Sequence, residues 1–309
     1  MIIPQAAEIR QSPEPSDIRT LGASSNTGAM KARPGWLRFL RQHPTVAVGG
    51  LILFLIVAAA IAAPLLGTTD PTRVNTIMRA RPPSALHLFG TDALGRDLYS
   101  RVLYGARISL LVGFAVAFLS SMGGLAIGLF AGFSRSADAI AMRVMDGLMS
   151  IPPILLAVAL MALNRGSVGN VIFAITIAEL PRVARLVRGV VLSLREQPYV
   201  DAAVTSGTSL PRIVLMHILP NTIAPMIVQA TYICASAMIT EAILSFIGAG
   251  TPPTVPSWGN IMAEARALWQ VKFYIVMFPA LFLSLTVLAV NLVGDGLRDA
   301  LDPRLAKNL

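Results

Sequence analysis

The sequence predicts an all-α polytopic membrane protein with six transmembrane helices. Of its 309 residues, 55% are hydrophobic and only 13% are charged, whereas soluble domains usually carry about 25% charged residues. Runs of about 20 apolar residues, the length that crosses a bilayer as a helix, recur along the chain. The net charge of +9 is, in so apolar a chain, more typical of membrane orientation than of nucleic-acid binding. We therefore expect contact with membrane lipid and none with nucleic acid.

The six predicted spans follow one another from residue 46 to residue 293. They cover residues 46–66, 108–133 and 151–163, a run that begins at Val171, and residues 222–250 and 273–293. The first run ends in small residues, as a secretory cleavage site does. It is too long and starts too late for a signal peptide, so we expect an uncleaved first helix within residues 36–66. Residues 1–30 lack apolar periodicity, which predicts a disordered cytoplasmic tail over residues 1–35.

The distribution of basic residues predicts that both termini are cytoplasmic. With the amino terminus inside and six spans, 16 of the 25 Lys and Arg residues fall on the inside, in agreement with the positive-inside rule. Residues 298–309 then form a second cytoplasmic tail. We expect a multi-pass protein whose polar loops alternate between the two sides of the membrane.

Residues 67–107 would lie outside although they hold six arginines. Within this external segment we expect an interfacial amphipathic helix that lies on the membrane. Its apolar side would carry Leu94, Leu98 and Val102, and its polar side Arg96, Asp97 and Arg101. Such a helix is first of all structural, and a docking surface for a partner is the alternative reading.

Between the fourth and fifth spans, residues 195–221 form a polar insertion. Pro198 suits the first turn of a short helix, and Gly207 would end that helix because glycine tolerates a left-handed backbone. A second short helix would follow, and Pro220 would end it before the next span. The result is a small cytoplasmic helix–turn–helix, with an ordinary loop as the alternative. Its tightly packed positions would be Ala202, Ala203 and Gly207.

This insertion resembles the EAA loop of ABC-importer permease subunits. The matching residues are Asp201-Ala202-Ala203, then Gly207 after three residues, then His217-Ile218-Leu219-Pro220 after nine more. Asp201 stands where the family usually has Glu. Residues 90–110, 241–262 and 291–304 resemble the dipeptide/oligopeptide/nickel-type permeases, the C-type inner membrane components of binding-protein-dependent transport systems. The residues to which the resemblance assigns ATPase coupling are Asp201, Ala202, Ala203, Gly207, His217, Leu219 and Pro220.

The resemblance implies the type I permease fold of ABC importers, with a permease core of five helices over residues 108–297. In that family each subunit forms half of a pathway with a second, different permease. Two ABC ATPase subunits bind on the cytoplasmic side, and an external solute-binding protein delivers the cargo. The implied function is the import of di- or oligopeptides across the cell inner membrane, with nickel or another small solute as the alternative.

The chain has no ATP-binding motif of its own. A P-loop needs Gly-Lys-Ser/Thr, and none of its lysines follows a glycine. We therefore expect no enzymatic activity and no cofactor in this chain, with ATP and Mg²⁺ bound by the partner ATPases. His43, His87 and His217 are scattered, and the single cysteine, Cys234, excludes a cysteine cluster, so we expect no metal site. No nucleophile is paired with a base, and we expect no catalytic residue.

Charged residues within the spans are candidates for the transport pathway, because charge at membrane depth is costly and faces protein or water. Glu179 and Arg182 would pair along the fourth span, beside the pathway or at its cytoplasmic mouth. If that span ends near Leu180, its arginines lie instead among the lipid headgroups. Glu241 makes either a helix-packing hydrogen bond or a substrate contact. A proton relay through Glu179 and Glu241 would make the chain an autonomous secondary transporter, although we see no internal repeat typical of such folds.

The Pro-rich loop after the fifth span is the predicted external docking surface. Its prolines lack backbone donors, which excludes a regular helix. We expect a tryptophan of this loop at the membrane–water interface, where Trp is enriched. The residues that could receive an external binding protein are Pro252, Pro253, Pro256 and Trp258.

Overall fold

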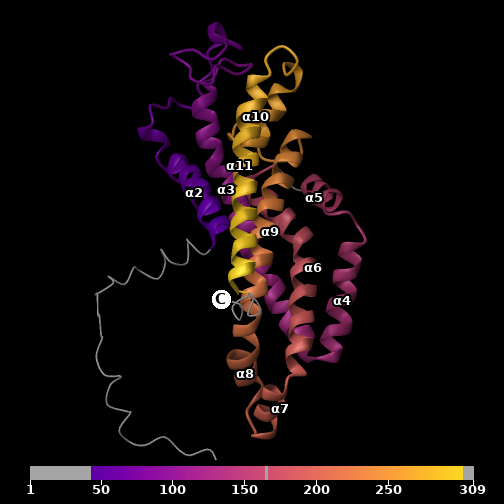
Figure 1. Ribbon diagram of the computed structural model, residues 1–309. Helices are drawn as coiled ribbons and strands as arrows, with labels where there is room; N and C mark the ends of the chain where they lie inside the picture. The colour runs from indigo at the N-terminus through magenta and orange to yellow at the C-terminus, as the bar shows by residue number, and fades with distance from the viewer. Residues whose placement is uncertain (1–42, 164–165, 302–309) are drawn as a thin grey trace, which may run out of the picture. The chain divides into compact units, whose positions relative to one another are not determined.

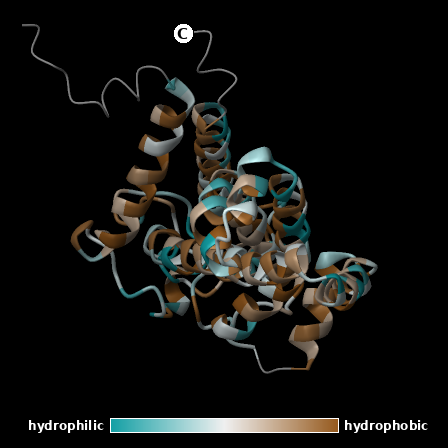
Figure 2. Cartoon of the chain, turned by 90° about the horizontal axis from the view of Figure 1, so that it is seen from below, coloured by the Kyte–Doolittle hydropathy of each residue, from teal (hydrophilic) through white to brown (hydrophobic). Residues whose placement is uncertain are grey.

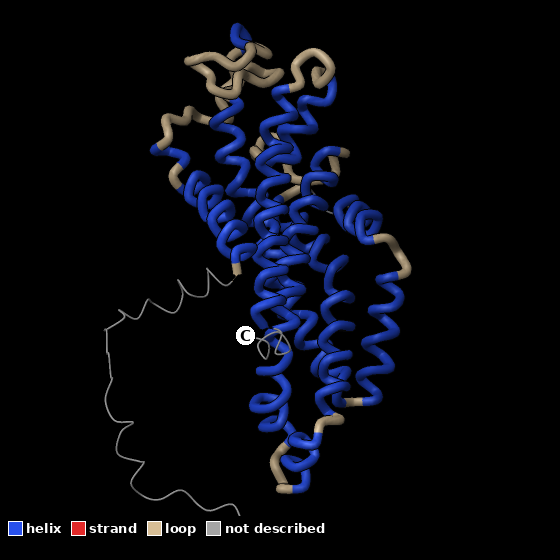
Figure 3. Tube along the Cα trace, in the orientation of Figure 1, coloured by secondary structure: helices blue, strands red, loops and turns tan. Residues whose placement is uncertain are grey.

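The computed structural model describes residues 43–163 and 166–301, and within these ranges the chain is helical and contains no strand (Figure 3). The predicted tail at residues 1–35, and residues 302–309 of the second tail, lie outside the described residues. The long helices, which run along one another in Figure 1, are α2 (Pro44–Ile61), α3 (Leu98–Phe133), α6 (Val168–Arg195), α9 (Leu219–Phe246) and α11 (Tyr274–Leu301). The shorter helices are α4 (Arg135–Met149), α5 (Pro153–Ala162), α7 (Pro198–Thr205), α8 (Leu210–Ile213) and α10 (Trp258–Glu264), with 3₁₀ turns at Ala63–Leu65, Thr76–Met78 and Ala265–Ala267.

The helices have the length and composition of a polytopic membrane protein. Four are long and apolar enough to cross a bilayer: α2, α3, α11 and the continuous helix Leu210–Phe246, which contains α8 and α9. Hydrophobic residues cover the outer sides of these helices as well as their inner sides (Figure 2), as expected of membrane spans. Helix α6 has 28 residues, but Glu179 and its arginines make it less apolar than the other long helices. The predicted fold class is confirmed. The predicted spans differ, however, in length and in apolar character, and not all of them are long apolar helices.

The predicted third span, residues 151–163, is not a straight transmembrane helix. Its helical part, α5, has 10 residues and would extend only about 15 Å at 1.5 Å per residue, half the thickness of the hydrocarbon layer. It forms a bent pair with α4 at an angle of 89° and counts as a span only together with it. Pro152 and Pro153 explain the bend, because proline lacks the backbone N–H and disfavours helix in the residue before it.

A stripe of small residues lets α3 approach α6 closely. A Cβ atom on Gly128 would lie 2.6 Å from the Cβ of Val187 and 2.8 Å from the carbonyl oxygen of Ala184. The same stripe includes Gly124, which meets Val183, and Gly132, which meets Val191. Glycines at intervals of four residues lie on one face of a helix, and in a membrane such faces pack by close backbone approach.

The expected interfacial helix within residues 67–107 does not form as a separate element. Leu94 precedes the helix, and α3 starts at Leu98, where the Asp97 side chain accepts a hydrogen bond from the backbone N–H of Ser100. Leu98, Val102 and also Arg101 are buried. The expectation was wrong because both faces of this segment are covered by other parts of the chain, so the helix has no polar face toward water.

Candidate functional site

A compact knob, formed by residues 198–218, projects from one end of the long helices, opposite the end that carries α10 (Figure 1). Helix α7 ends at Thr205 and is followed by Gly207, whose backbone is left-handed with φ of +75°. The N–H of Gly207 donates to the carbonyl of Val204 at 3.0 Å, and the N–H of Thr208 donates to that of Ala203 at 3.1 Å. These two bonds form a Schellman motif, which commonly ends helices at glycine. The predicted break at Gly207 is therefore confirmed.

The second half of the knob is continuous with α9. Helix α8 passes through a π-helical turn at Val214–Ile218 into α9. We expected Pro220 to end a separate helix, and this was wrong: Pro220 lies in the first turn of α9. A proline inside a regular helix would collide with the carbonyl four residues earlier, and a wider π turn directly before it avoids that collision. The knob thus continues into a helix that is long and apolar enough to cross a membrane.

The packing inside the knob differs from what we expected for Ala202, Ala203 and Gly207. Ala202 and Gly207 are exposed, Ala203 is half-buried, and a Cβ on Gly207 would meet no atom within 4 Å. The buried residues are instead Val200, Ile213 and Ile218. The rings of Tyr199 and His217 also meet, with 6.1 Å between their centroids.

The outer surface of the knob exposes both polar and large apolar side chains. Asp201 and Pro220 are exposed, and Leu219 is half-buried. The exposed apolar side chains of this surface are Val204, Leu210, Leu215 and Met216. An exposed apolar patch at the end of a helical bundle is typical of a protein interaction site. The alternation of polar and apolar residues in the insertion did not reveal this patch.

A polar cavity of about 320 Å³ lies among α5, α6, α9 and α11. Glu179 lies at its wall, where one carboxylate oxygen accepts a hydrogen bond from Arg182 Nη1 at 2.9 Å and the other accepts one from Ser236 Oγ at 3.2 Å. The Arg182 guanidinium lies over the Tyr232 ring, 5.4 Å from its centroid. The predicted pairing of Glu179 with Arg182 is present, and α6 continues as a helix well beyond Leu180 to Arg195.

The two following arginines of α6 pair with another helix. Arg185 lies 2.7 Å from Asp146 of α4, and Arg188 forms an ion pair with Asp138 of the same helix. These residues therefore fasten α6 to α4. Of the arginines spaced three apart along α6, Arg182 is the one that lines the polar cavity.

Glu241 is fully buried and joins three helices. It accepts hydrogen bonds from Ser245 Oγ at 2.9 Å and from Ser109 Oγ of α3 at 3.3 Å. Ser109 Oγ in turn accepts a bond from the backbone N–H of Trp258 at the start of α10. Glu241 does not line the cavity that holds Glu179. This arrangement favours the helix-packing role over contact with substrate.

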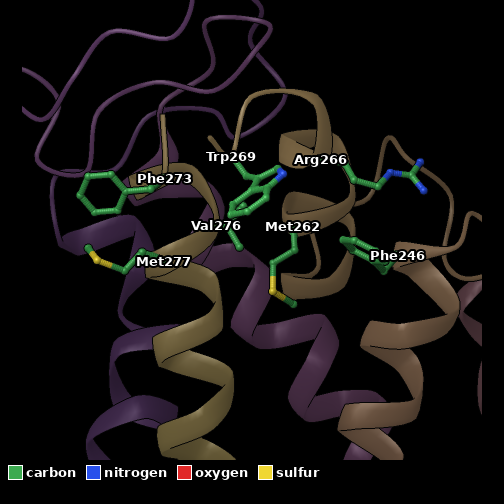
Figure 4. Close-up of a pocket in the computed structure, with 7 residues that line it drawn as sticks. All are labelled: Phe246, Met262, Arg266, Trp269, Phe273, Val276 and Met277. Atoms are coloured by element: carbon green, nitrogen blue, oxygen red, sulfur yellow. The ribbon is translucent and has the colours of Figure 1, made fainter. Parts of the chain in front are cut away.

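Trp258 does not lie at the membrane–water interface, contrary to our expectation. Its side chain is 0% exposed, and its indole Nε1–H donates to the carbonyl of Val102 at 3.0 Å. The exposed tryptophan at this end is Trp269, at 57%. Figure 4 shows Trp269 above an apolar pocket of about 430 Å³ that is also lined by Phe246, Met262, Arg266, Phe273, Val276 and Met277. Burial of its large aromatic ring, with the indole N–H hydrogen-bonded, stabilises Trp258 in the core, although its position next to a loop suggested a place at the surface.

The Pro-rich loop is held in one conformation by Asn260. Its side-chain amide donates to the carbonyls of Pro252 at 2.9 Å and Val255 at 3.0 Å. Pro253 is exposed, whereas Pro252 and Pro256 are half-buried. The three prolines remain candidates for an external contact, and Trp258 does not.

A buried ion-pair network ties the same end together. Arg101, 1% exposed, donates to Asp92 at 2.5 Å and to Glu264 at 2.5 and 3.2 Å. Arg96 pairs with Asp92 at 2.6 Å and also with Glu264. Asp97 lies 2.9 Å from His87 Nδ1. Two of the six arginines of residues 67–107, Arg96 and Arg101, are thus neutralised inside the protein, partly by Glu264, a residue that the sequence did not single out.

Comparison with known proteins identifies the family. Residues 103–307 match the family described as "Binding-protein-dependent transport system inner membrane component". A probable peptide ABC transporter permease protein of Sinorhizobium fredii is 53% identical over 268 residues, covering 87% of this chain and 92% of that protein. A dipeptide transport system permease protein of Alkalihalophilus pseudofirmus is 41% identical over 267 residues, covering 86% and 88%.

Two further comparisons agree with this family. A glutathione transport system permease protein of Pectobacterium atrosepticum is 41% identical over 274 residues, covering 88% of this chain and 91% of that protein. Among solved structures, an inward-facing form of the MetNI methionine ABC transporter matches with a TM-score of 0.56 at 19% identity, covering 65% of this chain and 96% of that one. At that identity the likeness concerns the fold alone. The chain belongs to the family of binding-protein-dependent transport system inner membrane components.

Proposed function

We propose that this chain is one of two different permease subunits of an ABC importer of di- or oligopeptides in the cell inner membrane. The names of its relatives, which include peptide, dipeptide and glutathione permeases, support a peptide cargo. An external solute-binding protein delivers the peptide near the Pro-rich loop. Two ABC ATPase subunits bind ATP with Mg²⁺ and supply the energy. Nickel or another small solute is the alternative cargo within the same architecture.

The observation that carries this proposal is the continuity of the knob with the walls of the polar cavity. Helix α7 directly follows α6, and α8 runs into α9 as one helix of 37 residues. Glu179 and Arg182 of α6, and Tyr232 and Ser236 of α9, line the cavity. Tyr232 is about 33 Å from Leu210 along the helix, at 1.5 Å per residue. A displacement of the knob by an ATPase therefore moves both helices that carry the cavity residues.

The first prediction tests this coupling in a complex assembled from this chain, a second permease, the ATPases and the binding protein. Wild-type complex in proteoliposomes should import labelled peptide only with ATP, and Gly207→Val should weaken ATPase attachment or uncouple hydrolysis from import. The left-handed backbone costs a β-branched residue about 1–3 kcal/mol, while the open space around Gly207 removes any steric clash. The readouts are ATPase co-purification and peptide uptake per ATP hydrolysed.

Gly207→Asn is the matched control, because asparagine accepts a left-handed backbone far better than valine. It should assemble and transport close to wild type. Normal coupling in Gly207→Val would show that residues 198–218 are only a loop. Peptide uptake by this chain alone, driven by a proton gradient, would favour an autonomous secondary transporter.

The proposed orientation places the knob in the cytoplasm and α10 outside. Arg298 and Leu301 at the end of α11 share a cavity with Ala224 and Pro225 of α9. A Cβ on Gly296 would collide with Val46 at the start of α2. The described ends of the chain therefore lie at the knob end, which supports two cytoplasmic termini.

The second prediction tests this orientation by cysteine labelling. Cys234 is buried and is replaced by Ala, after which Ser209→Cys or Thr254→Cys is introduced at an exposed position. A membrane-impermeant maleimide should label Thr254→Cys in intact cells and Ser209→Cys only after the membrane is opened. Labelling of Ser209→Cys from outside would reverse the topology.

A further inference from the structure

We infer that Arg182 binds the carboxylate group of the cargo within the membrane. This inference rests on the proposed import of peptides and names the chemical group that the polar cavity recognises. A guanidinium has five N–H donors, and among the described residues the Arg182 side chain makes one hydrogen bond, from Nη1 to Glu179. Its side chain is 39% exposed, whereas that of Glu179 is 4% exposed. The remaining donors are therefore open to a ligand in the cavity.

The lining of the cavity combines charged and polar side chains with the apolar residues Pro153, Ile154, Ala235, Ile239 and Ile243. Besides Glu179 and Arg182 it contains the polar side chains of Tyr232, Ser236, Thr240 and Asn291. An arginine at membrane depth is costly against acyl chains, so such residues face a protein interior or a water-filled path. In contrast, the cavity formed by α2, α3, α9 and α11 is almost wholly apolar, with residues such as Phe114, Phe118 and Ile227. The polar cavity therefore differs from this apolar cavity in offering charged and hydrogen-bonding groups to a ligand.

The neighbours of Arg182 hold it ready for a second carboxylate. Glu179 anchors Nη1 and is itself held by Ser236, and the Tyr232 ring supports the guanidinium plane. Because Glu179 belongs to the preceding turn of the same helix, it holds the guanidinium without joining Arg182 to another helix. Arg185 and Arg188 differ, since their guanidinium groups are joined to aspartates of α4. Glu179 and Tyr232 are accordingly positioning residues, and Arg182 is the ligand-binding residue.

The chemical class follows from this geometry. Arginine binds carboxylates through two parallel N–H···O bonds, which neither lysine nor a neutral amide reproduces. The cargo is therefore a solute with a free carboxylate, such as a peptide with an unmodified carboxyl terminus. A peptide whose terminus is an amide should lose this contact while it keeps every other one.

The test compares a peptide and its carboxyl-terminal amide in the assembled transporter. Both are supplied at concentrations that load the binding protein equally, checked by native mass spectrometry. Wild type should import the acid faster than the amide, and Arg182→Gln should lower acid import roughly 10-fold or more, the effect of a charge-assisted hydrogen bond, with little change for the amide. The rate of acid import by Arg182→Lys should lie between the rates of wild type and Arg182→Gln. Arg185→Gln, whose ion pair is exposed, should keep the wild-type acid-to-amide ratio.

A second readout does not depend on loading of the binding protein. Phenylglyoxal modifies exposed arginines, and mass spectrometry of the assembled transporter locates the modified residues. The peptide acid should slow the reaction at Arg182, and the peptide amide should not. If Arg182→Gln leaves the acid-to-amide ratio unchanged and the acid gives no protection, the inference is wrong while peptide import stands. If the wild-type complex imports no peptide of either kind, the proposed function itself fails.

Discussion

Asp92→Asn is expected to destabilise the end of the protein that carries α10 by about 3–5 kcal/mol, because it leaves a buried arginine without one of its two carboxylate partners. Arg101 is 1% exposed and loses the carboxylate oxygen 2.5 Å from its Nη1. Arg96 loses a partner at the same time. The remaining acid, Glu264, cannot neutralise two guanidinium groups alone. Thermal unfolding of the purified protein in detergent should show a large decrease in Tm, together with a lower yield in the membrane.

Asp70→Asn is the matched control for this experiment. Asp70 lies on the same segment before α3 but is exposed, and its side chain accepts hydrogen bonds from Thr72. Asp70→Asn should therefore change the Tm of the protein little. Adding Arg101→Met to Asp92→Asn should recover part of the loss, because it removes the unpaired charge. Equal Tm values for Asp92→Asn and Asp70→Asn would mean that the network contributes nothing to the fold.

Gly128→Leu is expected to separate α3 from α6 and to lower stability by about 1–3 kcal/mol, the usual effect of overpacking. The first carbon of a side chain at this position would already lie 2.6 Å from the Cβ of Val187. The rest of the leucine would have to occupy space filled by α6. Since α6 carries Glu179 and Arg182, transport should fall as well. Membrane yield, Tm and peptide uptake are the measurements.

Gly147→Leu controls for the change from glycine to leucine in a helix. Gly147 lies in α4, and a Cβ there would meet no atom within 4 Å. This variant should be as stable as wild type or slightly more, because leucine favours helix over glycine. Gly128→Ala should be intermediate between wild type and Gly128→Leu. A Gly128→Leu protein as stable as Gly147→Leu would contradict the close packing of α3 on α6.

The sequence by itself determined the fold class, the break at Gly207 and the family resemblance of residues 195–221. These features are local. Apolar runs of sufficient length form spans wherever the chain meets a bilayer, and a glycine after a short helix ends it through its own backbone freedom. The pairing of Glu179 with Arg182 is also local, since the two residues lie three apart on one helix.

The tertiary structure decided which polar and aromatic side chains are buried. Arg101 was assigned to a polar surface, yet it is neutralised in part by Glu264, 163 residues away. Trp258 and Trp269 lie near each other in sequence, but only Trp258 fits the core beside Val102. Arg182 differs from Arg185 and Arg188 only because α4 supplies aspartates to the latter two. Each outcome depends on a partner distant in the chain, and periodicity within one segment contains no information about such a partner.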